Sequence, residues 1–134
     1  MTTTTVPTKS RLAHHLPLLV TGAIAALGVA LIYRLVPDDF PDSLGGRLVL
    51  FAVALVTGPV FVVVIRWFAS RIESPLHRPT TVATVGALVF DSLMTGFAPQ
   101  FYGHHGAAST VVIASIVFGA VSIIVSEFLM SEGK

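Results

Sequence analysis

Four long apolar stretches dominate the sequence, and each is bounded by charged or helix-breaking residues. Crossing the hydrocarbon core of a bilayer takes about 20 mostly apolar residues in a helix. The stretches that meet this requirement lie at about residues 16–36, 47–70, 80–102 and 107–129. The pattern therefore predicts four transmembrane helices, preceded by a disordered tail over residues 1–10.

The segments between these stretches are short and rich in turn residues. Two prolines and three carboxylates lie between Pro37 and Asp42, and a second breaker segment runs from Glu73 to Pro79. Proline removes a backbone donor, so neither segment continues a buried helix. Short connections favour antiparallel packing of consecutive helices. We predict an all-α fold in which residues 1–134 form one integral membrane antiparallel four-helix bundle.

The composition agrees with insertion into a membrane. Only 11% of the residues are charged and 54% are hydrophobic, whereas about a quarter of residues are charged in soluble domains. Cysteine is absent, which excludes disulfides and thiolate metal sites. The net charge of +1 provides no basic surface. The expected partners are the lipid bilayer and, beyond it, another membrane protein or a second copy of the chain, but no nucleic acid.

The distribution of basic residues predicts the orientation. With four spans, six Lys and Arg residues fall on the side of the termini and two on the other side, Arg34 and Arg47. Because basic residues collect in cytoplasmic segments, we expect a cytoplasmic membrane protein with both termini in the cytoplasm. A cleaved signal peptide is the alternative for the first stretch, but its apolar run exceeds a usual signal core.

Asp91 is the most informative residue, because it lies within the third stretch. An ionised carboxylate at the bilayer centre costs about 2.5–3.5 kcal/mol on insertion scales, so it must face protein or trapped water. Small and polar residues recur with it at helical spacing: Thr84, Ala87, Leu88, Thr95 and Ala98. This stripe places Asp91 toward the bundle interior.

Two interpretations of Asp91 remain open. It is either a proton or cation site, or a neutral acid that joins helices. Pro59 frees the carbonyl of Leu55 at a similar depth, so a neutral Asp91 could donate to that carbonyl or bond Thr57. Arg34 is the other candidate partner. The predicted intramembrane polar site therefore comprises Asp91, Thr57, Thr95 and Arg34.

The remaining polar residues suggest no chemistry. The histidine pairs at residues 14–15 and 104–105 lack the spacing and the additional ligands of a metal site, and Glu127 reads as part of a solvated helix end. No catalytic motif is present, so we expect no enzyme, no cofactor and no metal.

Small residues recur at fourfold spacing in the first stretch at Gly22, Ala26 and Ala30. The last stretch has a similar seam, formed by Ala108, Ser115, Gly119, Ser122 and Ser126. Such seams let helix backbones approach closely, and we expect them to serve packing within the chain rather than dimerisation.

Two functions follow as hypotheses. The first is a non-enzymatic accessory or interaction protein of the membrane, because the loops are too short to hold a soluble site. The alternative is a small transporter or an ion- or proton-coupled permease subunit that uses Asp91. Small multidrug exporters share the length and helix count, but their essential acid lies in the first helix, which has none here.

The segment from Gly86 through Asp91 to Pro99, together with Tyr33 and Arg34, resembles a family of small four-helix bacterial membrane proteins, the domain of unknown function 5367. The shared features are an aromatic–Arg pair after the first helix and an apolar run with Asp, followed eight residues later by proline. The chain departs from the family pattern over residues 97–103, where a denser Phe-Pro pattern is expected. The resemblance implies four helices and no established activity.

Overall fold

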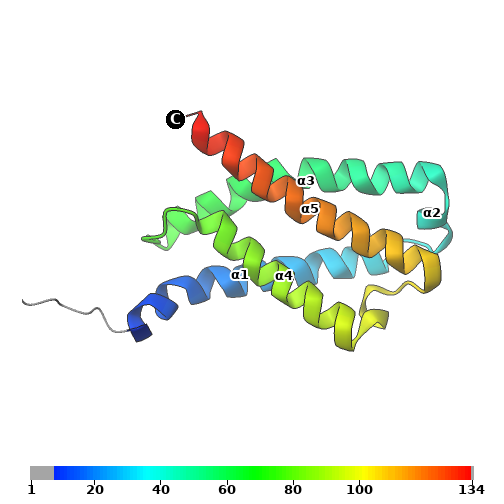
Figure 1. Ribbon diagram of the computed structural model, residues 1–134, viewed down its shortest axis with the longest axis horizontal. Coiled ribbons are helices and arrows are strands. Elements are labelled where there is room, and N and C mark those ends of the chain that lie inside the picture. Colours follow the sequence, from blue (N-terminus) through cyan, green and yellow to red (C-terminus); the bar gives the residue numbers. More distant parts are fainter. Residues whose placement is uncertain (1–7, 134) are drawn as a thin grey trace, which may run out of the picture.

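The computed structural model describes residues 8–133 and is all-α over this range (Figure 1). The long helices are α1 (Thr8–Arg34), α3 (Leu44–Arg71), α4 (Pro79–Phe97) and α5 (Gly106–Glu132). The short helix α2 (Asp39–Asp42) and the 3-10 helix η1 (Pro99–Tyr102) lie at one end of the bundle. We call this the distal end, comprising residues 35–43 and 98–105. The start of α1 and the end of α5 lie at the opposite, proximal end.

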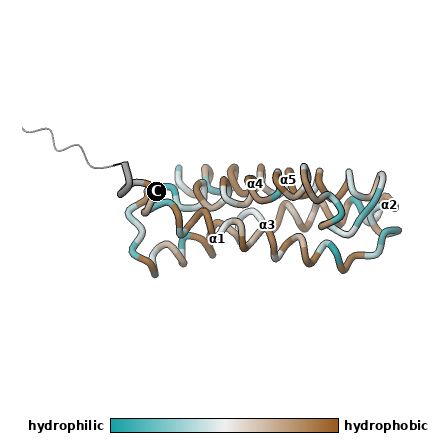
Figure 2. Tube along the Cα trace, turned by 90° about the horizontal axis from the view of Figure 1, so that it is seen from below, coloured by the Kyte–Doolittle hydropathy of each residue, from teal (hydrophilic) through white to brown (hydrophobic). Residues whose placement is uncertain are grey.

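All four long helices have the length and apolar composition needed to cross a membrane. Their apolar segments contain 19 to 28 residues, which corresponds to about 28–42 Å of helix, against a hydrocarbon core of about 30 Å. Hydrophobic residues run along the middle of the bundle, and hydrophilic ones gather toward its ends (Figure 2). The predicted all-α fold with four long helices is therefore confirmed, and each helix is long and apolar enough to cross a membrane.

The predicted helix bounds were wrong in two places. The tail predicted over residues 1–10 is partly helical, because α1 already begins at Thr8; residues 1–7 lie outside the described range. The third helix ends at Phe97 rather than at residue 102. Pro99 restricts the residue before it, and Ala98 accordingly leaves the helical conformation, with φ −144° and ψ 60°. The chain then turns through η1 toward the bundle.

The packing order also differs from the prediction. Consecutive long helices do run antiparallel, but the main contacts join α1 to α4 and α3 to α5, which are parallel pairs, and α1 makes little contact with α3. Figure 1 shows the two crossings, with α4 over α1 and α5 over α3. The bundle therefore consists of two crossed helix pairs, and the space between the pairs is less tightly filled.

Glycine determines where α1 and α4 cross. A Cβ on Gly22 would overlap the carbonyl oxygen of Ala83, and a Cβ on Gly86 would overlap the carbonyl oxygen of Leu19. The contact is reciprocal, because Ala83 lies three residues before Gly86 and Leu19 lies three residues before Gly22. Small residues allow this approach of parallel backbones, and the close packing supplies the attraction that apolar burial cannot supply in lipid.

The α3–α5 crossing uses the carbonyl that Pro59 leaves without a partner in its own helix. The hydroxyl of Ser122 donates to the Leu55 carbonyl oxygen at 2.7 Å, and a Cβ on Gly58 would overlap Ser122. The carbonyl is therefore satisfied by α5. Of the two partners suggested for a neutral Asp91, this carbonyl is not one that Asp91 uses among the described residues, because the donor to it is a serine of the directly packed helix.

Replacing Ser122 with alanine should destabilise the α3–α5 pair. The Leu55 carbonyl would lose its donor, and interhelical hydrogen bonds in membrane proteins contribute about 0.6–1.7 kcal/mol. Reversible unfolding in mixed detergent measures this loss. Ser126→Ala is the matched control on the same helix, because the Ser126 hydroxyl makes no hydrogen bond within the described residues. Equal stability of the two variants would contradict the assignment.

Candidate functional site in an intramembrane cavity

A cavity of about 490 Å³ lies between the two helix pairs. All four long helices and α2 contribute to its walls, which consist mostly of alanine, valine, leucine and isoleucine side chains. Asp91 is the one lining residue with an ionisable carboxyl group. Ligand sites in proteins typically have this character, with apolar walls, a few polar groups and a volume of about 300–1,000 Å³.

The cavity is open on the side where α1 and α3 fail to pack. Lining residues of both helices are accessible there: Ile32 and Val29 of α1 are 66% and 36% exposed, and Val49 and Val53 of α3 are 50% and 57% exposed. These positions lie within the apolar spans of their helices. In a bilayer, the opening would therefore face hydrocarbon rather than water.

Asp91 takes its hydrogen bond from Tyr102. The phenol donates to Asp91 Oδ1 at 2.8 Å, and Tyr102 itself is 1% exposed. The Tyr102 side chain reaches α4 because η1, which begins at Pro99, packs against both α1 and α4. Burial, and then the neighbouring Asp91, raise the pKa of Tyr102 above its usual value, which keeps the phenol protonated as a donor.

The second carboxyl oxygen of Asp91 has no hydrogen-bond donor within the described part of the chain. Asp91 lies six residues before the end of α4, or about 9 Å along the helix axis. Arg34, the predicted alternative partner, is exposed at the distal end with its side chain against Gly103. It forms no ion pair with Asp91 or with Asp38 among residues 12–133.

The other polar groups around the cavity are committed to partners of their own. Thr57 lines the cavity but donates to the Val53 carbonyl at 2.7 Å. Thr84 likewise donates to the carbonyl of Thr80. The remaining predicted site residue, Thr95, forms a side-chain hydrogen bond with the Tyr102 phenol. This bond partly offsets the rise in the pKa of Tyr102 that burial and Asp91 cause. Among the predicted site residues, Asp91 and Thr95 thus both contact Tyr102. Thr57 makes its hydrogen bond within its own helix.

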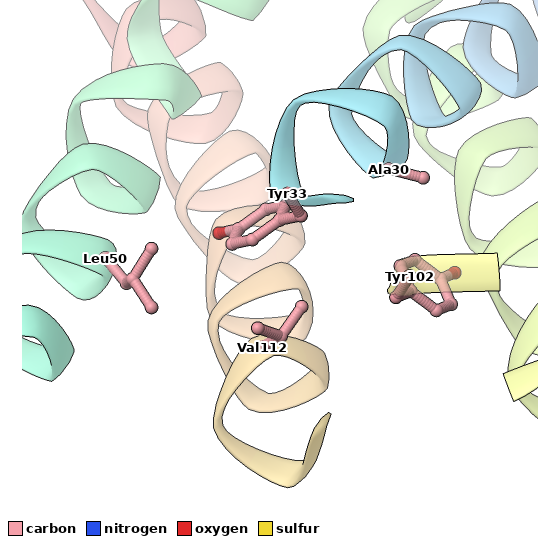
Figure 3. Close-up of a cluster of buried hydrophobic side chains, with 5 residues drawn as sticks. All are labelled: Ala30, Tyr33, Leu50, Tyr102 and Val112. Carbon is pink, nitrogen blue, oxygen red and sulfur yellow. The ribbon is translucent and has the colours of Figure 1, made fainter. Parts of the chain in front are cut away.

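A second polar pair crosses the distal part of the cavity. Tyr33 and Ser115 lie 2.8 Å apart through their hydroxyl groups, and Ser115 donates to the Val112 carbonyl, so Tyr33 is the donor in the first bond. Figure 3 shows Tyr33 above Val112 and to the right of Leu50, with Tyr102 below Ala30; these five residues form one buried cluster. The pair joins α1 to α5 across the two helix pairs.

Sequence reasoning missed several buried polar residues. Neither Tyr33 nor Tyr102 was expected to be buried from its local sequence, and they are 9% and 1% exposed. Glu127, which was assigned to a solvated helix end, is 6% exposed and accepts a hydrogen bond from Thr81 at 2.6 Å. Pro99 was the one local signal available, because a proline indicates that the third helix ends before it and that Tyr102 lies outside that helix.

No known protein family model, curated protein or solved structure matches this chain. The resemblance to the domain of unknown function 5367 therefore stays a prediction.

Proposed function

We propose that this protein binds a small apolar molecule with a positive charge inside the bilayer, and that it acts as a small transporter or permease subunit with Asp91 as the counter-ion. The observation behind the proposal is a lone acid in an apolar cavity that opens toward lipid. A molecule that partitions into the bilayer would reach this cavity sideways between α1 and α3.

The physical reason is the incomplete satisfaction of Asp91. A carboxylate in an apolar site needs compensation by hydrogen bonds or by an opposite charge. Tyr102 supplies one hydrogen bond to one oxygen, which leaves the other oxygen for a ligand. A proton is the alternative occupant of that position. A proton and an organic cation would therefore compete for Asp91, which is the basis of proton-coupled exchange.

The accessory role has less support, because the small-residue seams of α1 and α5 pack against other helices of the same chain and so are not free for a partner. Gly22 lies against α4, and Ser122 lies against Gly58 of α3. We place the protein in the cytoplasmic membrane, with both termini in the cytoplasm, from the distribution of Lys and Arg. The proposal includes no enzymatic step and no cofactor.

Binding of tetraphenylphosphonium to the full chain in lipid nanodiscs tests the proposal. The control ligand is tetraphenylborate, which has nearly the same shape and the opposite charge. We expect saturable binding of the cation that weakens as the pH is lowered, because protons compete for Asp91. The anion should show partition into lipid only. Equal binding of the two ions, or partition alone for both, would refute the proposal.

A further inference from the structure

His104 occupies a buried position at the distal end of the bundle and joins two connections. It is 2% exposed. Its Nδ1 lies 2.8 Å from Oδ1 of Asp38, and its Nε2 lies 2.8 Å from the carbonyl oxygen of Tyr33. The ring therefore ties the η1–α5 connection to the end of α1 and to the segment before α2.

The two partners determine how many protons this arrangement holds. A carbonyl oxygen only accepts, so Nε2 must carry a hydrogen that it donates to Tyr33. A neutral imidazole has one N–H, so its Nδ1 would then be an acceptor facing a carboxylate, which is also an acceptor. The contact at 2.8 Å is a hydrogen bond only if one further proton lies between His104 and Asp38.

We infer that His104 and Asp38 form a proton-binding site that holds the distal end of the cavity closed. With the proton bound, both ring nitrogens are in hydrogen bonds and the connections are joined. When the proton leaves, the neutral ring has one N–H for two acceptors, so one of its two hydrogen bonds is lost and the connections are no longer joined through the ring. The segment released by this loss includes Val36 and Phe40, which line the cavity.

Solvent can exchange this proton directly, because the Asp38 side chain is 68% exposed although the His104 side chain is 1% exposed. The carboxyl group thus connects a buried imidazole to water at the end of the bundle where the two connections meet.

The other charged groups near His104 belong to the surrounding elements. Arg34 at the end of α1 is exposed, and its aliphatic part lies against Gly103. On α2, Asp39 and Asp42 are exposed, and Arg47 of α3 donates to the Pro41 carbonyl.

His105 is exposed beside His104, and Tyr102, which donates to Asp91, lies two residues before His104 in the chain. Within the described residues, Asp38 is the charged side chain in contact with the His104 ring.

Cysteine labelling of the full chain in nanodiscs tests the inference, because the natural sequence contains no cysteine. The probe is Val36→Cys, a cavity-lining position, reacted with a water-soluble maleimide between pH 5.5 and 8. The reference is Leu35→Cys, which is 84% exposed and corrects for the increase in thiolate with pH. We expect the corrected labelling rate of position 36 to rise by about fivefold or more as the proton is lost.

A matched pair of substitutions isolates the proton. In Asp38→Asn the amide donates to a neutral Nδ1, so both hydrogen bonds form without an additional proton and the labelling should be slow at every pH. Asp39→Asn removes the same charge from a neighbour without contact to His104, and it should keep the pH dependence of the parent protein. A flat profile in the parent, or an unchanged rise in Asp38→Asn, would overturn the inference.

A spectroscopic measurement on the unsubstituted protein keeps the test independent of folding defects. Nitrogen-15 spectra of labelled histidine, assigned with His104→Gln, report the protonation of both ring nitrogens. At pH 5.5 we expect either two N–H groups on His104 or, by infrared, a protonated Asp38. A singly protonated His104 opposite an ionised Asp38 would exclude the site.

The inference that this closure controls the access of a ligand to the cavity rests on the proposed function. The existence of the His104–Asp38 proton site does not. In Asp91→Asn the pH dependence of labelling should persist, whereas cation binding should be lost, so the failure of one proposal is distinguishable from the failure of the other.

Discussion

Asp91→Asn is expected to reduce the affinity for tetraphenylphosphonium by roughly 30- to 5,000-fold. Removing one member of a desolvated charge pair costs about 2–5 kcal/mol, and each 1.4 kcal/mol corresponds to a factor of about ten. Asparagine retains the size of the side chain and an oxygen that accepts from Tyr102. The substitution therefore removes the charge and leaves the shape of the cavity in place. Equilibrium dialysis of the nanodisc-embedded variants measures the change.

The control for this prediction is Thr57→Val. Thr57 also lines the cavity, but its hydroxyl is bound to the Val53 carbonyl and offers little to a ligand. We expect this variant to bind the cation within about threefold of the parent, because no charge is lost. Thermal unfolding of both variants should show that Asp91→Asn is no less stable than the parent. If Asp91→Asn bound tetraphenylphosphonium as tightly as the parent, Asp91 would not be the counter-ion of the cation.

The four spans could be predicted from the sequence because length and hydropathy are local properties. The pairing of the helices could not, since small residues occur on several helices and any two such seams can pack. Gly22 was recognised as part of a seam, but nothing in the sequence indicates that its partner is Ala83. The choice depends on backbone geometry over the whole bundle.

The site was predicted in part. The inward position of Asp91 followed from its helical stripe and is confirmed by its place in the cavity wall. The hydrogen-bond partner of Asp91 could not be predicted from this stripe, because Tyr102 reaches Asp91 only after the turn at Pro99. His104 gave no local signal either. A histidine in a short connection reads as exposed until the segment carrying Asp38 is placed beside it.

The pH dependences expected at Asp91 and at the His104–Asp38 site have different consequences for a transported cation. Protonation of Asp91 would displace a bound cation, whereas protonation of the His104–Asp38 site would hold the distal end closed. An acidic medium at the distal end would therefore both empty and close the cavity from that side. The two sites are separate in structure, so their titrations can be removed one at a time.

Gly22→Ala is expected to destabilise the protein by about 1–3 kcal/mol, the usual effect of inserting a methyl group into a tightly packed contact. The new Cβ would overlap the Ala83 carbonyl oxygen, which is backbone and has no rotamer by which to move aside. The two helices would have to separate at their crossing. Detergent-dependent unfolding, followed by circular dichroism, measures the loss.

Gly28→Ala on the same helix provides the control. A Cβ there meets nothing within 4 Å, and alanine favours the helical conformation by about 1 kcal/mol over glycine. This variant should be as stable as the parent or more stable. Because the two glycine contacts are reciprocal, their substitutions should not be additive. Once Gly22→Ala has separated the helices, Gly86→Ala should lower the free energy of unfolding by less than it does alone. Strict additivity, or a Gly22→Ala variant as stable as Gly28→Ala, would mean that α1 and α4 do not cross at these glycines.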